Sequence, residues 1–218
     1  MLEIGEELSP KKSFVWAVEW PGWCRSGRTV EVARELLVAV GPRYATVART
    51  AGDKLPTVTI AELEVVESVT GGSGTEFGVP SAIVDDDRRP VSTAEAKRLA
   101  GLVAAAWTTF NLVASQAPAE LRKGPRGGGR DTAKMIGHVV EADSAYADEI
   151  GIKHKPPQPG DVDAVAALRN SILEVLNNPS DGSPLAGRKW TPRYAARRIA
   201  WHAIDHAWEI EDRSEFKP

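Results

Sequence analysis

The stretch RIAWHAIDHAWEI, residues 198–210, decides the fold of the second half of the chain. Its small and aliphatic residues recur at helical spacing, and a Thr-Pro pair at 191–192 is typical of a helix start, so we predict a helix to about Arg213. The apolar stripe of this helix consists of Ala196, Ile199, Ala203, Ala207 and Ile210. His202 and His206 lie toward one edge of that stripe, about 40° apart on one face.

Three further helices are expected before this one. Ser92 and Glu95 form a full capping box, and Asp131 is a suitable N-cap for the next helix. Either Asp161 or Asp163 opens a third helix. The four predicted spans are 92–116, 131–151, 161–177 and 191–213, with a flexible basic loop between Arg122 and Arg130. Four helices joined by loops predict a helical bundle.

A third histidine extends the arrangement on the last helix. His138 falls on the helix predicted at 131–151, at the edge of an apolar stripe made of Met135, Val139, Ala142 and Tyr146. Edge positions on packed helices converge near the mouth of a bundle, so we expect His138 to meet His202 and His206 there. Three neutral imidazoles with one open position form a catalytic metal site, in which water or a substrate takes the fourth position.

The type of ligand does not identify the metal. Imidazole suits zinc, nickel and iron, and manganese remains an option because availability often decides which metal is bound. Zinc or nickel is the first expectation, with iron or manganese as alternatives. The competing interpretation is that each histidine serves packing or the surface, since two histidines four residues apart on a helix are a weak motif on their own.

The second half, about residues 92–213, resembles the DinB-like superfamily of bacterial four-helix bundles, which includes the mycothiol-dependent maleylpyruvate isomerases. The resemblance rests on GRD at 129–131, MIGHVVEA at 135–142 and the stretch at 198–210. That family has one histidine on its second helix and a pair on its last helix. His138, His202 and His206 match this pattern one for one, so the resemblance implies that they hold a divalent metal ion.

The resemblance also implies a chemistry. Characterised relatives are thiol-dependent isomerases or transferases in which the metal binds a low-molecular-weight thiol, and a bound cation does lower the pKa of a thiol. A metal-dependent hydrolase is a further option, because a fold by itself does not define an activity. Glu141, three residues after His138, is the candidate general base or hydrogen-bond partner of a ligand; the alternative is a solvated helix carboxylate.

The first half mixes strand and helix signals, so the predicted class is α+β, with a small α+β unit at 1–88 and the all-α bundle at 89–218. A helix is expected after the N-cap Thr29, with a break at Gly41-Pro42. Its apolar positions are Val32, Leu36, Leu37, Val40 and Tyr44. Strands are predicted at 14–18, 57–69 and 81–84, with a loop at 71–74 and a charged connector at 85–90.

The segment FVWAVEWPGWCRSGRTVEVA, residues 14–33, resembles the HicB-like antitoxin fold. The likeness consists of a strand, a Pro-Gly turn followed closely by Cys24, a Gly-x-Thr loop, and a helix with Glu and Ala near its start. It implies a compact unit that binds a protein partner; the DNA-binding tail of that family is absent, and the bundle takes its place. Trp16, Trp20 and Trp23 are interpreted as packing residues, and Cys24 as a small buried residue, not a reactive thiol.

A second apolar face on the last helix needs its own explanation. It carries Tyr194, Trp201, Ile204 and Trp208, although a bundle helix at a free surface is polar on its outer side. We expect the first half of the chain to cover this face, and a homodimer is the alternative. The charged residues of the same helix, Arg198 and Glu209 among them, are interpreted as a salt-bridged surface.

Composition narrows the range of functions. The 218 residues are 42% apolar and 26% charged with a net charge of −3, which gives no sign of nucleic-acid or membrane-surface binding. No secretory signal or membrane span is visible, and a single cysteine fits the reducing cytoplasm. Two hypotheses remain: a metal-dependent enzyme acting on a small molecule, and a non-catalytic metal- or ligand-binding protein with an N-terminal interaction module. An open coordination position beside a pocket favours the first.

Overall fold

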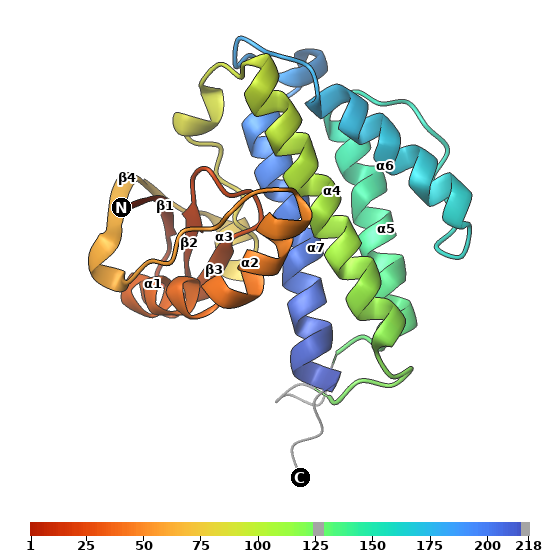
Figure 1. Cartoon of the computed structure of the whole chain (residues 1–218), viewed down its shortest axis with the longest axis horizontal. Helices are drawn as coiled ribbons and strands as arrows, with labels where there is room; N and C mark the ends of the chain where they lie inside the picture. Colours follow the sequence, from red (N-terminus) through yellow and green to blue (C-terminus); the bar gives the residue numbers. More distant parts are fainter. Residues whose placement is uncertain (124–128, 215–218) are drawn as a thin grey trace.

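The residues that the structure describes, 1–123 and 129–214, form a mixed α+β fold in this computed structural model, as the sequence predicts. They contain seven α-helices and one four-stranded sheet. Figure 1 shows the sheet and its short helices beside a group of long helices. Residues 124–128, which belong to the predicted basic loop, and residues 215–218 lie outside the described part of the chain.

The sheet has the strand order β3-β2-β1-β4. Its strands are β1 (Leu2–Leu8), β2 (Ser13–Ala17), β3 (Cys24–Gly27) and β4 (Leu63–Thr70). Neighbours β1 and β2, and β2 and β3, are antiparallel, whereas β4 runs parallel to β1. The strand predicted at 14–18 is therefore confirmed as β2.

The sequence analysis does not predict β1, because the strand LEIGEEL is rich in carboxylates. Two of them are buried against distant partners: Glu6 pairs with Arg34 at 2.6 Å, and Glu7 accepts hydrogen bonds from the backbone N–H groups of Ser81 and Ala82 at 3.3 and 3.0 Å. The same bonds explain why the strand predicted at 81–84 is wrong. Two N–H groups of that segment are bonded to a carboxylate, not to a neighbouring strand.

Two other predicted boundaries change for local reasons. The strand predicted at 57–69 starts only at Leu63, because Glu62 accepts a hydrogen bond from the backbone N–H of Thr59 and closes a short 3₁₀ helix, η1 (Ile60–Glu62). The loop predicted at 71–74 is confirmed only for residues 71 and 72, because a short helix, α3 (Ser73–Phe77), already begins at Ser73.

The helix predicted after Thr29 exists as two helices, α1 (Val30–Ala39) and α2 (Gly41–Thr50), divided at the predicted Gly-Pro break. Proline fits the first turn of α2, where its missing N–H leaves no helical bond unmade. Val32 and Leu36 are each 40% exposed, so the apolar side predicted for α1 is too wide.

All four long helices that the sequence predicts are present. They are α4 (Thr93–Gln116), α5 (Thr132–Glu149), α6 (Val162–Leu176) and α7 (Pro192–Ser214). The capping box of α4 forms as expected, with Ser92 and Glu95 exchanging hydrogen bonds. Helix α7 packs against both α4 and α5, and α6 packs against the outer side of the same two helices (Figure 1).

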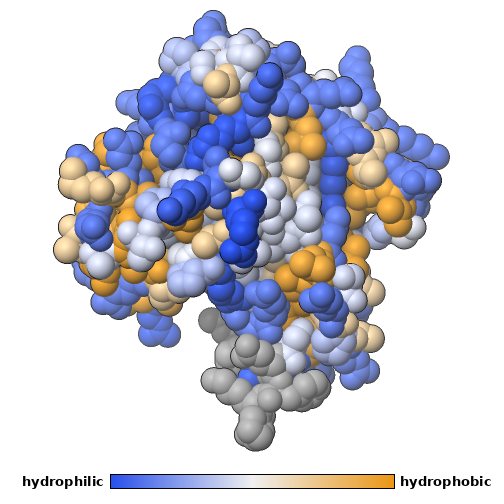
Figure 2. Space-filling view, in the orientation of Figure 1, coloured by the Kyte–Doolittle hydropathy of each residue, from blue (hydrophilic) through white to orange (hydrophobic). Residues whose placement is uncertain are grey.

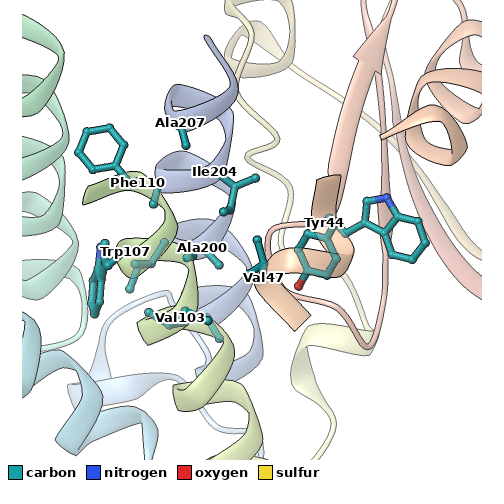
Figure 3. Close-up of a cluster of buried hydrophobic side chains, with 14 of the residues drawn as sticks. Tyr44, Val47, Val103, Trp107, Phe110, Ala200, Ile204 and Ala207 are labelled. Atoms are coloured by element: carbon teal, nitrogen blue, oxygen red, sulfur yellow. The ribbon is translucent and has the colours of Figure 1, made fainter. Parts of the chain in front are cut away.

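Both halves of the molecule share one hydrophobic core. Figure 3 shows Tyr44 and Val47 of α2 facing Ile204 and Ala200 of α7, with Trp107 and Phe110 of α4 on the other side of α7. The aromatic face of α7 is covered by the first half of the chain, as we expect from the sequence: Trp201 is 5% exposed and meets the Phe14 ring edge-to-face at 6.1 Å.

The predicted boundary at residue 88 coincides with a short 3₁₀ helix, η2 (Asp86–Arg88), which precedes α4. Asp87 of this connector is buried and pairs with Arg197 of α7 at 2.6 Å. The division into two domains stays a prediction, because the core is continuous across the boundary. Among the described residues, no helix combines the length and apolarity needed to cross a membrane.

Candidate metal centre

The three histidines singled out in the sequence lie together in the structure. His138 on α5 faces His202 and His206 on α7, and one nitrogen from each ring lies within 4.8 Å of the other two. The spacing on α7 places its two rings one turn apart, and the packing of α5 on α7 brings the third. Among the described residues, these three histidines form the whole group of side chains that could hold one metal ion here.

The distances fit a shared cation. The Nε2 atoms of His138 and His202 are 3.2 Å apart. Zinc binds imidazole nitrogen at about 2.0–2.1 Å, so two ligands in a tetrahedral site are separated by about 3.3 Å. The ring centroids of the three histidines lie 4.6 to 5.0 Å from one another. The side chains therefore have a mutual spacing that a small divalent ion requires.

Glu209 fixes the orientation of one ring. Its Oε2 accepts a hydrogen bond from Nδ1 of His206 at 3.0 Å, which leaves Nε2 of that ring free to act as a ligand. Arg213 in turn donates to Glu209 at 3.0 Å, and both hydrogen bonds lower the pKa of the Glu209 carboxyl. Metal-binding histidines commonly donate their other N–H to a carboxylate in this way.

Sequence reasoning missed the role of Glu209, which it assigned to a salt-bridged surface. A signal was present, because a carboxylate three residues after a histidine lies on the same side of a helix. The ambiguity arises because α7 carries several charged residues at such spacings. Only the folded structure shows which of these charged side chains contacts a histidine.

Burial lowers the pKa of His202 and of His138 and so favours their neutral rings. His202 is 6% exposed, and its burial holds the pKa of the ring well below its ordinary value of 6.5. Burial also lowers the pKa of His138. Neutral rings are required for metal binding, because a protonated imidazole has no lone pair to offer.

One polar atom here has no protein partner. Nδ1 of His202 is buried and makes no hydrogen bond to any described residue. A buried polar atom without a partner costs about 1–3 kcal/mol, and such atoms in folded proteins call for a ligand, an ion or water. A cation bound at Nε2 of His202 would leave this atom without a partner, because the two ring nitrogens point in different directions.

The surroundings of the histidines are aromatic and cationic. The Tyr146 ring meets His202 edge-to-face at 5.6 Å and Trp190 at 5.2 Å. The guanidinium group of Arg198 lies over the rings of Tyr146 and Trp201 at 5.4 and 4.6 Å. Its Nη1 is buried and has no hydrogen-bond partner among the described residues.

The site differs in position from the expected bundle mouth. His138 and His206 are partly exposed, as an accessible site requires, but the three residues lie well inside α5 and α7, away from the helix ends. Glu141, the candidate general base, is exposed on α5 and does not belong to the three-donor group. Its catalytic role stays a prediction.

Two further residues with potentially reactive side chains lie outside the site. Cys24 is buried beside Phe14 and Trp16, and burial raises the pKa of its thiol, which confirms the interpretation as a packing residue. The fourth histidine, His154, is hydrogen-bonded to Ser144 at 2.6 Å and is not one of the three donors.

Comparisons with known proteins leave the family of this chain undetermined. No family model, no curated protein and no solved structure matches it. The resemblances of the two halves to the DinB-like and HicB-like families therefore remain predictions from sequence motifs, and the geometry of the three histidines stands on its own.

Proposed function

We propose that the chain binds one divalent metal ion through His138, His202 and His206 and acts on a small molecule with the help of a low-molecular-weight thiol. The observation that carries this proposal is the three-histidine group in which Glu209 orients one ring. Three protein donors leave a fourth position for a thiol, a substrate or water, which is typical of catalytic and not structural zinc sites. The DinB-like motifs supply the reaction class, a thiol transferase or isomerase.

The protein residues have definable parts in such a reaction. A divalent cation at the three imidazoles lowers the pKa of a thiol or water bound beside them. Glu209 keeps a proton on Nδ1 of His206, while Tyr146, which packs on Trp190, covers the ring of His202. Arg198 offers a buried, unpartnered N–H to a polar group of the substrate. Imidazole ligands fit zinc or nickel best, with iron or manganese as alternatives.

Metal content tests the site. Protein purified without a histidine tag should contain close to one equivalent of a divalent metal by elemental analysis, and the His202→Ala variant should contain almost none. His154→Ala is the matched control, because it removes the histidine that is not part of the group. Equal and negligible metal in the parent and in His202→Ala would refute the proposal.

Thiol binding tests the reaction class separately. After replacement of the metal by Co²⁺, a small thiol such as 2-mercaptoethanol should produce a sulfur-to-cobalt charge-transfer band, since a thiolate occupies the open position. A cobalt spectrum that thiol leaves unchanged would favour the second hypothesis, a metal-binding protein without thiol chemistry. The N-terminal half offers one observation in favour of an interaction module, because Val32, Leu36, Val65 and Val66 are each at least 40% exposed.

A further inference from the structure

A cavity lies on the far side of α5 from the histidines. It has a volume of about 560 Å³ and lies between α4, α5 and α6, with mostly apolar walls that include Trp107, Phe110, Ile136, Val140, Val165 and Leu173. Ile136 and Val140 are each two positions from His138, so they point about 160° away from it around α5. Figure 2 shows apolar side chains at the edge of the molecule next to α6. The volume is within the range of small-molecule sites, about 300–1,000 Å³.

A buried ion pair lies at the wall of this cavity. Arg169 of α6 is 8% exposed and donates from Nε to Oδ2 of Asp143 at 2.9 Å, while the Trp107 indole N–H donates to Oδ1 of the same carboxylate at 3.0 Å. Nη1 of Arg169 donates to the side-chain oxygen of Asn111 at 3.2 Å. Both carboxylate oxygens of Asp143 are therefore satisfied.

One donor of this network is unused. Nη2 of Arg169 makes no hydrogen bond to any of the residues that the structure describes, and it is not one of the fully buried atoms that lack a partner, so it is reachable from solvent or from the cavity that Arg169 lines. A guanidinium group has five N–H donors, so Arg169 keeps donor capacity for a ligand after its bonds to Asp143 and Asn111. The cavity thus combines mostly apolar walls with a hydrogen-bond donor on an arginine that an ion pair holds in place, and Thr108, Asn111 and Asn170 are the other polar residues that line it.

The charge of the network limits what binds there. Asp143 already neutralises Arg169 across a short, buried contact. A carboxylate ligand would add a second negative charge beside Asp143 without a second cation, and an unpaired buried charge is strongly unfavourable. An uncharged oxygen acceptor satisfies Nη2 without that cost.

We propose that this cavity binds an uncharged, mostly apolar small molecule whose carbonyl or amide oxygen accepts a hydrogen bond from Nη2 of Arg169. The ligand is held by contact with Trp107, Phe110 and the aliphatic walls, and the hydrogen bond from Arg169 sets its orientation. This site is separate from the histidine group and does not depend on the function proposed for it.

A matched pair of probes tests the ligand class. 2-Naphthamide and 2-naphthoate have the same ring system and differ in the charge of one polar group. We expect saturable one-to-one binding of 2-naphthamide by isothermal titration calorimetry at pH 7.5, and at least tenfold weaker binding of 2-naphthoate. Equal or tighter binding of the carboxylate would overturn the requirement for an uncharged ligand, and absence of saturable binding of 2-naphthamide would overturn the site.

Two neighbouring alanines on α6 locate the binding. Ala166 lines the cavity and Ala167 does not, and both are exposed, so either position tolerates a larger side chain. Ala166→Trp should abolish binding of 2-naphthamide, while Ala167→Trp should retain the affinity of the parent. Both variants should keep the metal content of the parent, because the histidines lie on the other side of α5. Retention of full affinity in Ala166→Trp would show that the probe binds elsewhere and refute the assignment.

Discussion

Single residues determine which nitrogen atoms of the histidine group are available. Glu209 holds the Nδ1 proton of His206, and burial keeps His202 and His138 unprotonated near neutral pH. Asp143 shows the opposite effect of burial on an acid, because a carboxyl group resists ionisation in an apolar environment. The hydrogen bond of Glu209 and the burial of Asp143 can each be tested by one substitution.

Removal of Glu209 should weaken metal binding without removing a ligand. In Glu209→Ala the His206 ring loses the acceptor that fixes its tautomer, so we expect a loss of about 10- to 100-fold in zinc affinity, measured by competition with a chelator. Glu211→Ala serves as the control, because Glu211 lies on the same helix but pairs with Arg43 at the surface. Identical affinities of the two variants would contradict the assigned role of Glu209.

Asp143 should make the stability of the fold depend on pH in mildly acidic solution. Burial raises the pKa of this carboxyl from 3.8 to about 6, an effect only partly offset by Arg169. Since the folded state binds the proton more tightly, the contribution of Asp143 is largest below pH 4 and falls as the pH rises toward about 6. The difference in unfolding free energy between the parent and Asp143→Asn, from urea titrations, should therefore shrink across this range. A difference that is constant between pH 4 and pH 6.5 would contradict the raised pKa.

At the scale of elements, the connector before α4 is tied to α7 by a buried ion pair. Asp87 of η2 and Arg197 of α7 have side chains only 3% and 6% exposed, and Arg197 also donates to the backbone oxygen of Ala82. Its guanidinium group lies 4.4 Å from the centroid of Trp16 in β2. One side chain of α7 therefore contacts the connector and the sheet together.

Breaking this pair from one side should be costly. Asp87→Ala leaves the charge of Arg197 buried without its partner, so we expect a loss of about 3–5 kcal/mol in unfolding free energy, measured by urea denaturation. Asp85→Ala is a close control, because the Asp85 side chain is 99% exposed, and a change of about 0.5 kcal/mol or less is expected. Similar effects of the two substitutions would show that the buried pair does not hold the elements together.

In the whole molecule, the two halves are held together by a shared hydrophobic core as well as by the chain that connects them. Helix α7 has one face against α4 and α5 and the opposite face against the sheet and α2, so almost all of its apolar residues are buried. Trp208 is 2% exposed, with the guanidinium groups of Arg25 and Arg43 over its ring. Because α7 is buried on both sides, the stability of each half of the molecule depends on the other half.

We therefore expect the described halves to unfold in a single cooperative transition. Ile204→Ala, at the contact between α7 and α2, should cost about 2–5 kcal/mol and lower amide hydrogen-exchange protection by the same amount in α2 and in α5. Leu112→Ala is the control, because Leu112 is 55% exposed on α4 and a change of about 0.5 kcal/mol or less is expected. Loss of protection in α2 alone would show that the first half unfolds independently.

The sequence by itself determined the parts of this protein that depend on local signals. The caps at Ser92 and Asp161, the Gly-Pro break and the helical periodicity locate the helices within a few residues, because capping and amphipathicity act over one or two turns. The spacing of His202 and His206 likewise determines a shared face. The motifs at His138 then indicated the third member of the group.

Only the tertiary structure decided what depends on contacts between distant residues. Strand β1 exists because Glu6 and Glu7 find partners more than twenty residues away, which no local pattern reveals. The meeting of His138 with the two histidines of α7 and the cavity beside Arg169 likewise follow from how α5 packs on α6 and α7. The physical reason is that a buried polar group is stable only with a specific partner, and the fold supplies that partner from elsewhere in the chain.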